Sequence, residues 1–162
     1  MRLAVYPEEE IMKIRILDYR PPKIAQLLVL TAALLHWATP PGHLHIYANH
    51  LLGIIVGTGG FAIMMWGWWL FRKFGTAICP TAKSQHLVTS GIYRFTRNPM
   101  YLGVVGMLLA IAIVVGTFPF YLAAVAYFVV INHVFCPYEE SKLAETFGDG
   151  YRSYKNNVRP WI

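Results

Sequence analysis

Nine polar side chains with chemical capacity gather in two separate segments of the sequence. They are His86, Tyr93, Arg94, Arg97, Asn98 and Tyr101 in the middle, and Glu139, Glu140 and Arg159 near the end. Carboxylates, aromatic faces and a guanidinium could together bind a ligand that carries both a cation and a carboxylate. The simpler interpretation is structural: arginines reach lipid headgroups, and the two glutamates cap a helix and pair with Arg97.

The charge-free stretches of the sequence predict the helices that position these side chains. Hydrophobic residues make up 56% of the 162-residue chain and charged residues only 14%, well below the charge content of soluble domains. All charged residues lie in three blocks, 1–23, 72–97 and 139–162. Each of the two charge-free stretches between them is about twice as long as the roughly 20 residues that one membrane crossing needs. Each stretch must therefore fold back once.

Proline and glycine mark the two reversals, Thr39-Pro40-Pro41-Gly42 and Gly116-Thr117-Phe118-Pro119, because proline interrupts helices. We predict an all-α integral membrane fold with four transmembrane helices in two helical hairpins. The spans would lie near residues 24–38, 51–71, 101–115 and 120–135, within a single membrane domain covering 1–162. The segment 1–23, the loop 72–100 and the tail 137–162 would lie outside the bilayer.

The tail and the glycines in the spans give two further structural predictions. Pro137 is expected to begin a tail helix that ends at Gly148, followed by an amphipathic helix containing Tyr151 and Tyr154. The glycines in the spans, among them Gly53, Gly57, Gly59, Gly60, Gly103 and Gly106, should let helices approach closely. Gly57-Thr58-Gly59-Gly60 lacks the full spacing of a nucleotide-binding loop.

The basic residues predict the orientation. All 14 lysines and arginines fall on one side of the predicted spans, and such residues stay in the cytoplasm. Both termini should therefore be cytoplasmic, and the small size indicates a prokaryotic plasma membrane. The net charge of +6 suits anionic lipid headgroups, and no nucleic-acid motif is present. The histidines His43, His45 and His50 have no carboxylate or cysteine beside them, so no metal site is expected.

The predicted hairpin of the last two spans brings the two polar segments together. Its ends must emerge side by side, so residues 97–101 should lie close to residues 138–140. A basic segment would then face an acidic one at the membrane surface.

Three blocks of sequence resemble a known family. They are Gln85-His86-Leu87-Val88-Thr89-Ser90-Gly91-Ile92-Tyr93, then Arg97-Asn98-Pro99-Met100-Tyr101-Leu102-Gly103, then Glu139-Glu140 through Leu143 to Phe147-Gly148, with Tyr151, Tyr154 and Val158-Arg159. This ordered pattern covers roughly Phe71 to Trp161 and resembles the isoprenylcysteine carboxyl methyltransferase and phospholipid methyltransferase group.

The resemblance implies S-adenosylmethionine as the cofactor, bound in a cytoplasm-facing pocket that the middle loop, the hairpin ends and the tail helices would form. It also implies a lipophilic methyl acceptor, such as an isoprenylcysteine carboxylate or a phospholipid amine. By the same resemblance, the cofactor contacts would fall on His86, Leu87, Val88, Tyr93, Asn98, Pro99, Met100, Tyr101 and Glu140. Glu139, Arg97 and Arg159 would serve the reacting centre or the ligand carboxylates. Asn98 stands where the farnesyl-cysteine enzymes usually have histidine, so the identity of the acceptor stays open.

Two other functions compete with methyl transfer. A membrane reductase of the sterol-reductase type would share the C-terminal architecture, but no site for the 2′-phosphate of its nicotinamide cofactor is evident. A small non-enzymatic membrane scaffold would bind no cofactor at all. The absence of charge within the spans argues against an ion path.

Overall fold

The computed structural model describes residues 20–40, 45–75 and 86–162. Its regular elements, in chain order, are α2 (Pro21–Ala38), α3 (His50–Lys73), the 3-10 helix η1 (Gly91–Arg94), α4 (Pro99–Val115), α5 (Phe118–Val130), the π-helical turn η2 (Ile131–Phe135), α6 (Cys136–Phe147) and α7 (Asp149–Asn157). The described part of the chain therefore contains no β-strand, only an isolated bridge between His45 and Thr117. Most of the predicted N-terminal segment, part of the middle loop and His43 lie outside the described residues.

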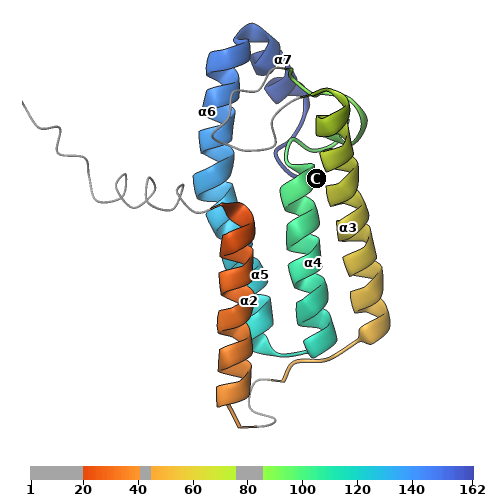
Figure 1. The fold of residues 1–162 in the computed structure, drawn as a ribbon, viewed down its shortest axis with the longest axis vertical. Helices are drawn as coiled ribbons and strands as arrows, with labels where there is room; N and C mark the ends of the chain where they lie inside the picture. The colour runs from red at the N-terminus through yellow and green to blue at the C-terminus, as the bar shows by residue number, and fades with distance from the viewer. Residues whose placement is uncertain (1–19, 41–44, 76–85) are drawn as a thin grey trace, which may run out of the picture.

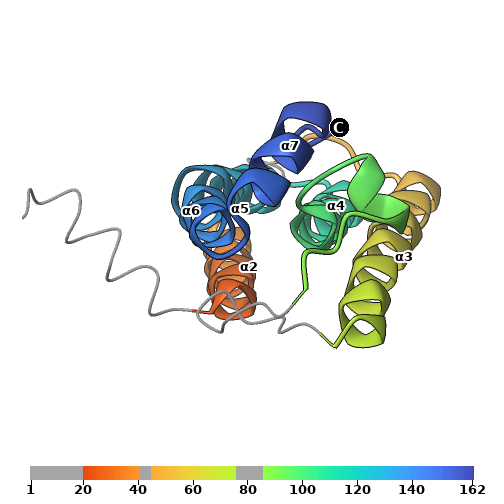
Figure 2. The ribbon, with the colours of Figure 1, turned by 90° about the horizontal axis from the view of Figure 1, so that it is seen from above.

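The helices α2, α3, α4 and α5 run alternately up and down, with α4 in the middle of the group (Figures 1 and 2). α3 packs along one side of α4 and α5 along another, and α2 packs mainly on α5. The predicted hairpin of the last two spans is confirmed. The predicted first hairpin is wrong in one respect, because α2 and α3 are antiparallel but do not pack together: α4 lies between them (Figure 2).

Glycine residues explain why α3 packs against α4. A Cβ on Gly60 would lie 2.8 Å from the Gly103 carbonyl oxygen, and a Cβ on Gly103 would lie 2.5 Å from the Gly60 carbonyl oxygen. The two backbones approach closely only because neither residue has a side chain. Gly53, Gly57, Gly67 and Gly106 also face α4 or α3, whereas Gly59 faces open space. The predicted role of these glycines is confirmed except at Gly59.

Both predicted reversals occur where expected. α2 ends at Ala38, directly before Thr39-Pro40, and Pro21 starts this helix three residues before the predicted span. α4 ends at Val115, and Gly116 adopts a φ of 69° that favours glycine. A side chain on Gly116 would also meet the backbone of Ala48, since its Cβ would lie 2.7 Å from the Ala48 nitrogen.

The fourth helix differs from the prediction. α5, η2 and α6 form one continuous helix of 30 residues, Phe118–Phe147, so Pro137 does not begin a new helix. Proline inside a helix lacks a donor and crowds the carbonyl four residues earlier. Here the preceding turn is π-helical, with the Cys136 amide bonded to the Ile131 carbonyl, and such wider turns accommodate an irregularity. The predicted end at Gly148 is confirmed, as is the following helix α7.

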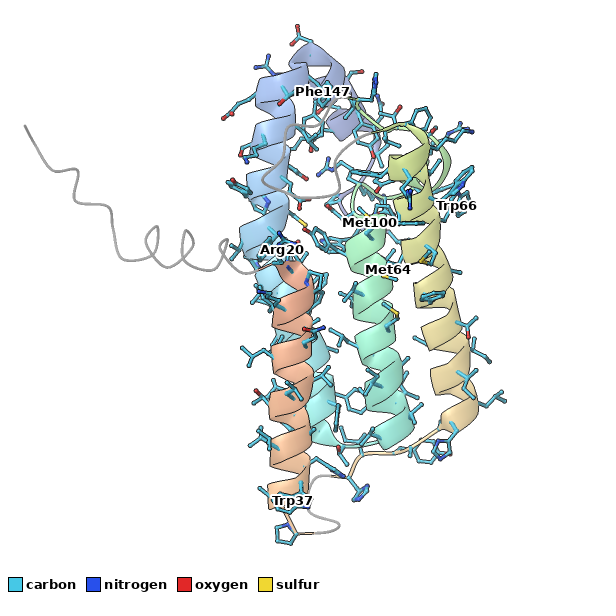
Figure 3. The ribbon with its side chains drawn as sticks, viewed as in Figure 1. Arg20, Trp37, Met64, Trp66, Met100 and Phe147 are labelled. Carbon is cyan, nitrogen blue, oxygen red and sulfur yellow. The ribbon has the colours of Figure 1, made fainter. Side chains whose placement is uncertain are left out.

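The outer surface suits lipid. By length and composition α3 and the helix Phe118–Phe147 are able to cross a membrane, and α4 is a shorter apolar helix. Large apolar side chains are exposed along α2, α3 and α5, including Leu34, Phe61 and Leu122, which a soluble protein would not display in such numbers. The lysines and arginines of the described residues lie at the start of α2, at the end of α3, in the loop before α4, and in α6, α7 and the segment after it. Because neighbouring helices are antiparallel, these positions share one end of the bundle, away from Trp37 at the other end of α2 (Figure 3).

Candidate active site

The guanidinium of Arg97 is the centre of a polar network at the charged end of the bundle. Its Nη2 donates to Glu140 Oε1 at 2.7 Å, and its Nη1 donates to the carbonyls of Lys155 and Val158 at 2.8 and 3.1 Å. Lys155 Nζ binds the other Glu140 oxygen at 2.8 Å. The Arg97 and Glu140 side chains are only 9% and 16% exposed. This network joins the middle loop to α6 and α7 and confirms that the basic segment faces the acidic one.

Glu139, the neighbouring carboxylate, has a different partner. The Tyr101 hydroxyl, on the first turn of α4, donates to Glu139 Oε1 at 2.5 Å. Glu139 lies beyond the apolar part of its helix, which ends at Phe135. Burial raises the pKa of Glu139 to about 7, and the hydrogen bond from Tyr101 opposes that rise. A carboxyl group with this pKa can release and take up a proton near neutral pH.

The described part of the middle loop before Arg97, residues 86–96, packs around Tyr93. Val88 and Tyr93 of the loop form a small buried cluster with Leu70 of α3, and the Tyr93 ring lies 5.3 Å from that of Phe71. The hydroxyl of Tyr154, on α7, donates to the Tyr93 carbonyl at 2.7 Å. The loop is therefore held between α3 and α7.

The segment after α7, residues 158–161, runs alongside the end of the same loop. The Arg97 amide donates to the Arg159 carbonyl at 3.0 Å. The Pro160 carbonyl accepts from both Thr96 Oγ1 and Asn98 Nδ2, each at 3.0 Å. The amide donor of Asn98 is thus used to hold this segment at the start of α4.

Most of the predicted site residues lie together. Arg97, Asn98, Tyr101, Glu139 and Glu140 meet where α4, α6 and the segment after α7 converge. Pro99 and Met100 begin α4 and lie against Gly67 of α3, and Val88 and Tyr93 lie in the adjoining loop. Leu87 is half-buried, and the side chains of His86 and Arg159 are exposed. Arg159 contributes its backbone carbonyl, and its guanidinium does not join the Arg97 network.

Three contributors were not predicted from the sequence. Lys155 is the second partner of Glu140, Tyr154 holds the Tyr93 carbonyl, and Trp161 donates its indole N–H to Asn132 Oδ1 at 2.7 Å. The helical spacing of Tyr151, Tyr154, Lys155 and Val158 indicates a helix, but spacing alone does not say which residue of another element each side chain meets.

Two buried polar atoms of this region have no hydrogen-bond partner among the residues that the structure describes. They are the Tyr93 hydroxyl and Arg97 Nε. Buried polar groups are nearly always hydrogen-bonded, so unpaired atoms beside a charged cluster are candidates for contact with a ligand.

The fold and the site define a helical, membrane-associated protein with a carboxylate, arginine and tyrosine cluster at one end of its apolar helices. The chain belongs to the phospholipid methyltransferase family, whose sequence model matches residues 48–150. That range runs from the start of α3 to the first residues of α7, and it includes Arg97, Tyr101 and both glutamates. The family is one of membrane methyltransferases.

One curated relative is similar over part of the chain. It is an uncharacterized protein of Haemophilus influenzae, 38% identical over 63 residues, which are 39% of this chain and 100% of that protein. No solved structure matches the chain.

Proposed function

We propose that this protein transfers a methyl group from S-adenosylmethionine to a lipophilic acceptor at the cytoplasmic face of the membrane. One observation carries the proposal. Glu139 and Glu140 are adjacent on one helix, yet one carboxylate meets Tyr101 and the other meets Arg97, at the charged end of an apolar bundle. Membership in a methyltransferase family supports the same chemistry.

The residues present fit this cofactor, which carries an ammonium, a carboxylate and a sulfonium. Each Glu140 oxygen already pairs with one cation, Arg97 or Lys155, and has a further lone pair that could accept a hydrogen bond from the cofactor ammonium. Arg97 Nε and the Tyr93 hydroxyl are buried polar atoms without a partner among the described residues. The cofactor contacts would come from His86, Leu87, Val88, Tyr93, Asn98, Pro99, Met100, Tyr101 and Glu140. When bound, the cofactor supplies an electrophilic methyl group. Because both Nη atoms of Arg97 are already paired, this side chain would chiefly hold Glu140 in place.

The environment of Glu139 favours an amine acceptor over a carboxylate acceptor. A second carboxylate beside a buried carboxylate would be repelled, whereas an ammonium would be attracted. Glu139 would take one proton from the ammonium and leave a neutral amine with a free lone pair. The Tyr101 hydroxyl would keep the carboxylate oriented toward the acceptor. An aminophospholipid is the class of acceptor that combines such an amine with apolar chains.

The proposed membrane arrangement has four spans, α2 to α5, with both termini in the cytoplasm of a prokaryotic cell. The exposed apolar side chains of α2, α3 and α5 would face lipid. Arg72 and Lys73 lie over the rings of Trp68 and Trp69 at 5.0 and 5.2 Å, an arrangement suited to the headgroup region.

Calorimetric titration of the detergent-solubilised protein with S-adenosylmethionine tests the cofactor. We expect one-to-one binding, and Glu140→Gln should weaken it about tenfold or more, since it removes a charge-assisted contact worth roughly 1.5–3 kcal/mol. Glu145→Gln is the matched control, because Glu145 is an exposed glutamate on the same helix and its loss should leave affinity unchanged. No binding by the wild-type protein in detergent or in lipid nanodiscs would refute the proposed function and favour a scaffold.

Radiolabelled methyl transfer tests the acceptor. We expect labelling of phosphatidylethanolamine in nanodiscs and none of a farnesylcysteine. Labelling of the farnesylcysteine alone would overturn the choice of an amine.

A further inference from the structure

The segment formed by residues 158–161 makes more contacts than its length suggests. Within four residues, the carbonyls of Val158, Arg159 and Pro160 all accept hydrogen bonds from Thr96, Arg97 or Asn98. The bonding partners on the loop immediately precede α4, which begins at Pro99. This segment therefore holds in place the residues that directly precede α4.

Trp161 attaches the other end of the segment to the fourth helix. Its indole N–H donates to Asn132 Oδ1 at 2.7 Å, and its ring lies 4.9 Å from that of Phe128. Trp161 also packs against the buried cluster that contains Tyr127 and Phe135. Asn132 lies in η2, the π-helical turn of the same continuous helix that carries Glu139 seven residues later.

A continuous link therefore runs from one half of the candidate active site to the other. Trp161 is held on the helix of the two glutamates, and the adjacent Pro160 holds Asn98, three residues before Tyr101. The contact between Tyr101 and Glu139 joins α4 to the helix of the glutamates, and the contact between Arg97 and Glu140 joins the loop directly before α4 to the same helix. A change in the link would alter the relative position of these elements, and small misplacements at a reacting centre reduce rates strongly.

We propose that Trp161 is a positioning residue of the methyl-transfer site. Through its hydrogen bond to Asn132, Trp161 holds residues 158–161 against residues 96–98. This contact keeps the start of α4 in a fixed position relative to the helix of Glu139 and Glu140. The inference rests on the proposed function. Residues 158–161 lie beyond the range 48–150 that the family model matches.

Hydrogen exchange tests the positioning without any ligand. In Trp161→Phe, which keeps an aromatic ring but has no N–H donor, the Arg97 amide should exchange about 2- to 10-fold faster, as expected for the loss of one net hydrogen bond. Asn132→Leu removes the acceptor and should give the same increase, and the double variant should add nothing further. Trp37→Phe is the control, because Trp37 is 87% exposed at the far end of α2. Unchanged exchange in both single variants would overturn the proposal.

Calorimetric titration of the same proteins with S-adenosylmethionine, below the melting temperature of each, tests the functional consequence. We expect affinity to fall about 3- to 10-fold in Trp161→Phe and in Asn132→Leu, and to remain unchanged in Trp37→Phe. A merely structural role would lower the melting temperature while the folded protein kept its affinity, and that result would overturn the proposal. If the wild-type protein itself bound no cofactor, the proposed function would fail, whereas loss of affinity confined to the variants would support both.

Discussion

Tyr101 and Glu139 are 38 residues apart in the sequence, and a hydrogen bond from the tyrosine hydroxyl to the carboxylate joins them. The bond connects the first turn of α4 to the polar end of the fourth helix, where burial raises the pKa of Glu139 to about 7. It is the contact most directly tied to the proposed proton transfer.

The rate should therefore depend on the protonation of Glu139. If Glu139 accepts a proton from the acceptor amine, kcat/KM should rise as the pH increases through about 7, because only the ionised carboxylate acts as a base. Tyr101→Phe removes the hydrogen bond that lowers the pKa, so the midpoint should move to higher pH. The pH profile of methyl transfer in nanodiscs measures both effects. Glu145→Gln should retain the wild-type profile, and a wild-type profile in Glu139→Gln would rule out this role.

The pairing of Glu140 with Arg97 should matter far more for stability than its pairing with Lys155. Arg97→Met leaves a largely buried carboxylate without its closest partner and should lower the free energy of unfolding by about 3–5 kcal/mol. Lys155 is 49% exposed, so Lys155→Met should cost less than about 1 kcal/mol. Thermal unfolding in detergent compares the two variants. Equal losses would mean that the Arg97 pair is not effectively buried.

The crossing of α3 and α4 should tolerate a methyl group at Gly59 and not at Gly103. A Cβ on Gly103 would meet the Gly60 carbonyl and the Met64 backbone, so Gly103→Ala should destabilise the protein by about 1–3 kcal/mol. Gly59 has nothing within 4 Å of the added carbon, and Gly59→Ala should be neutral or slightly stabilising, since alanine is the better helix former. Melting temperatures provide the measurement. Similar effects at both positions would contradict the close helix contact.

Tyr127 should be replaceable by phenylalanine without loss of stability. Its side chain is fully buried, and its hydroxyl has no partner among the described residues. Removing an unpaired buried hydroxyl should leave the free energy of unfolding unchanged or raise it by up to about 1 kcal/mol. Thermal unfolding without ligand checks this outcome, with Tyr121→Phe on the same helix as control. A marked loss of stability would show that the hydroxyl is bonded to an internal water.

Several features followed from the sequence by itself. Two long charge-free stretches, each interrupted by proline, specified four helices and their turns, because ionised side chains are costly in lipid and proline ends a helix. The basic residues specified which ends of the helices lie together. The tight turn at Gly116 required α4 and the fourth helix to lie antiparallel and side by side, and this placed Arg97 and Tyr101 beside the two glutamates.

Other features were decided only by the tertiary structure. Apolar helices can pack in several orders, and the matching glycine surfaces of α3 and α4 selected the one with α4 in the middle. The π-helical turn carried the fourth helix through Pro137. Glu140 meets both Arg97 and Lys155, and Trp161 meets Asn132, because the folded chain brings these side chains within hydrogen-bonding distance. Local periodicity shows which face of a helix a residue occupies, but its partner depends on the positions of all the other helices.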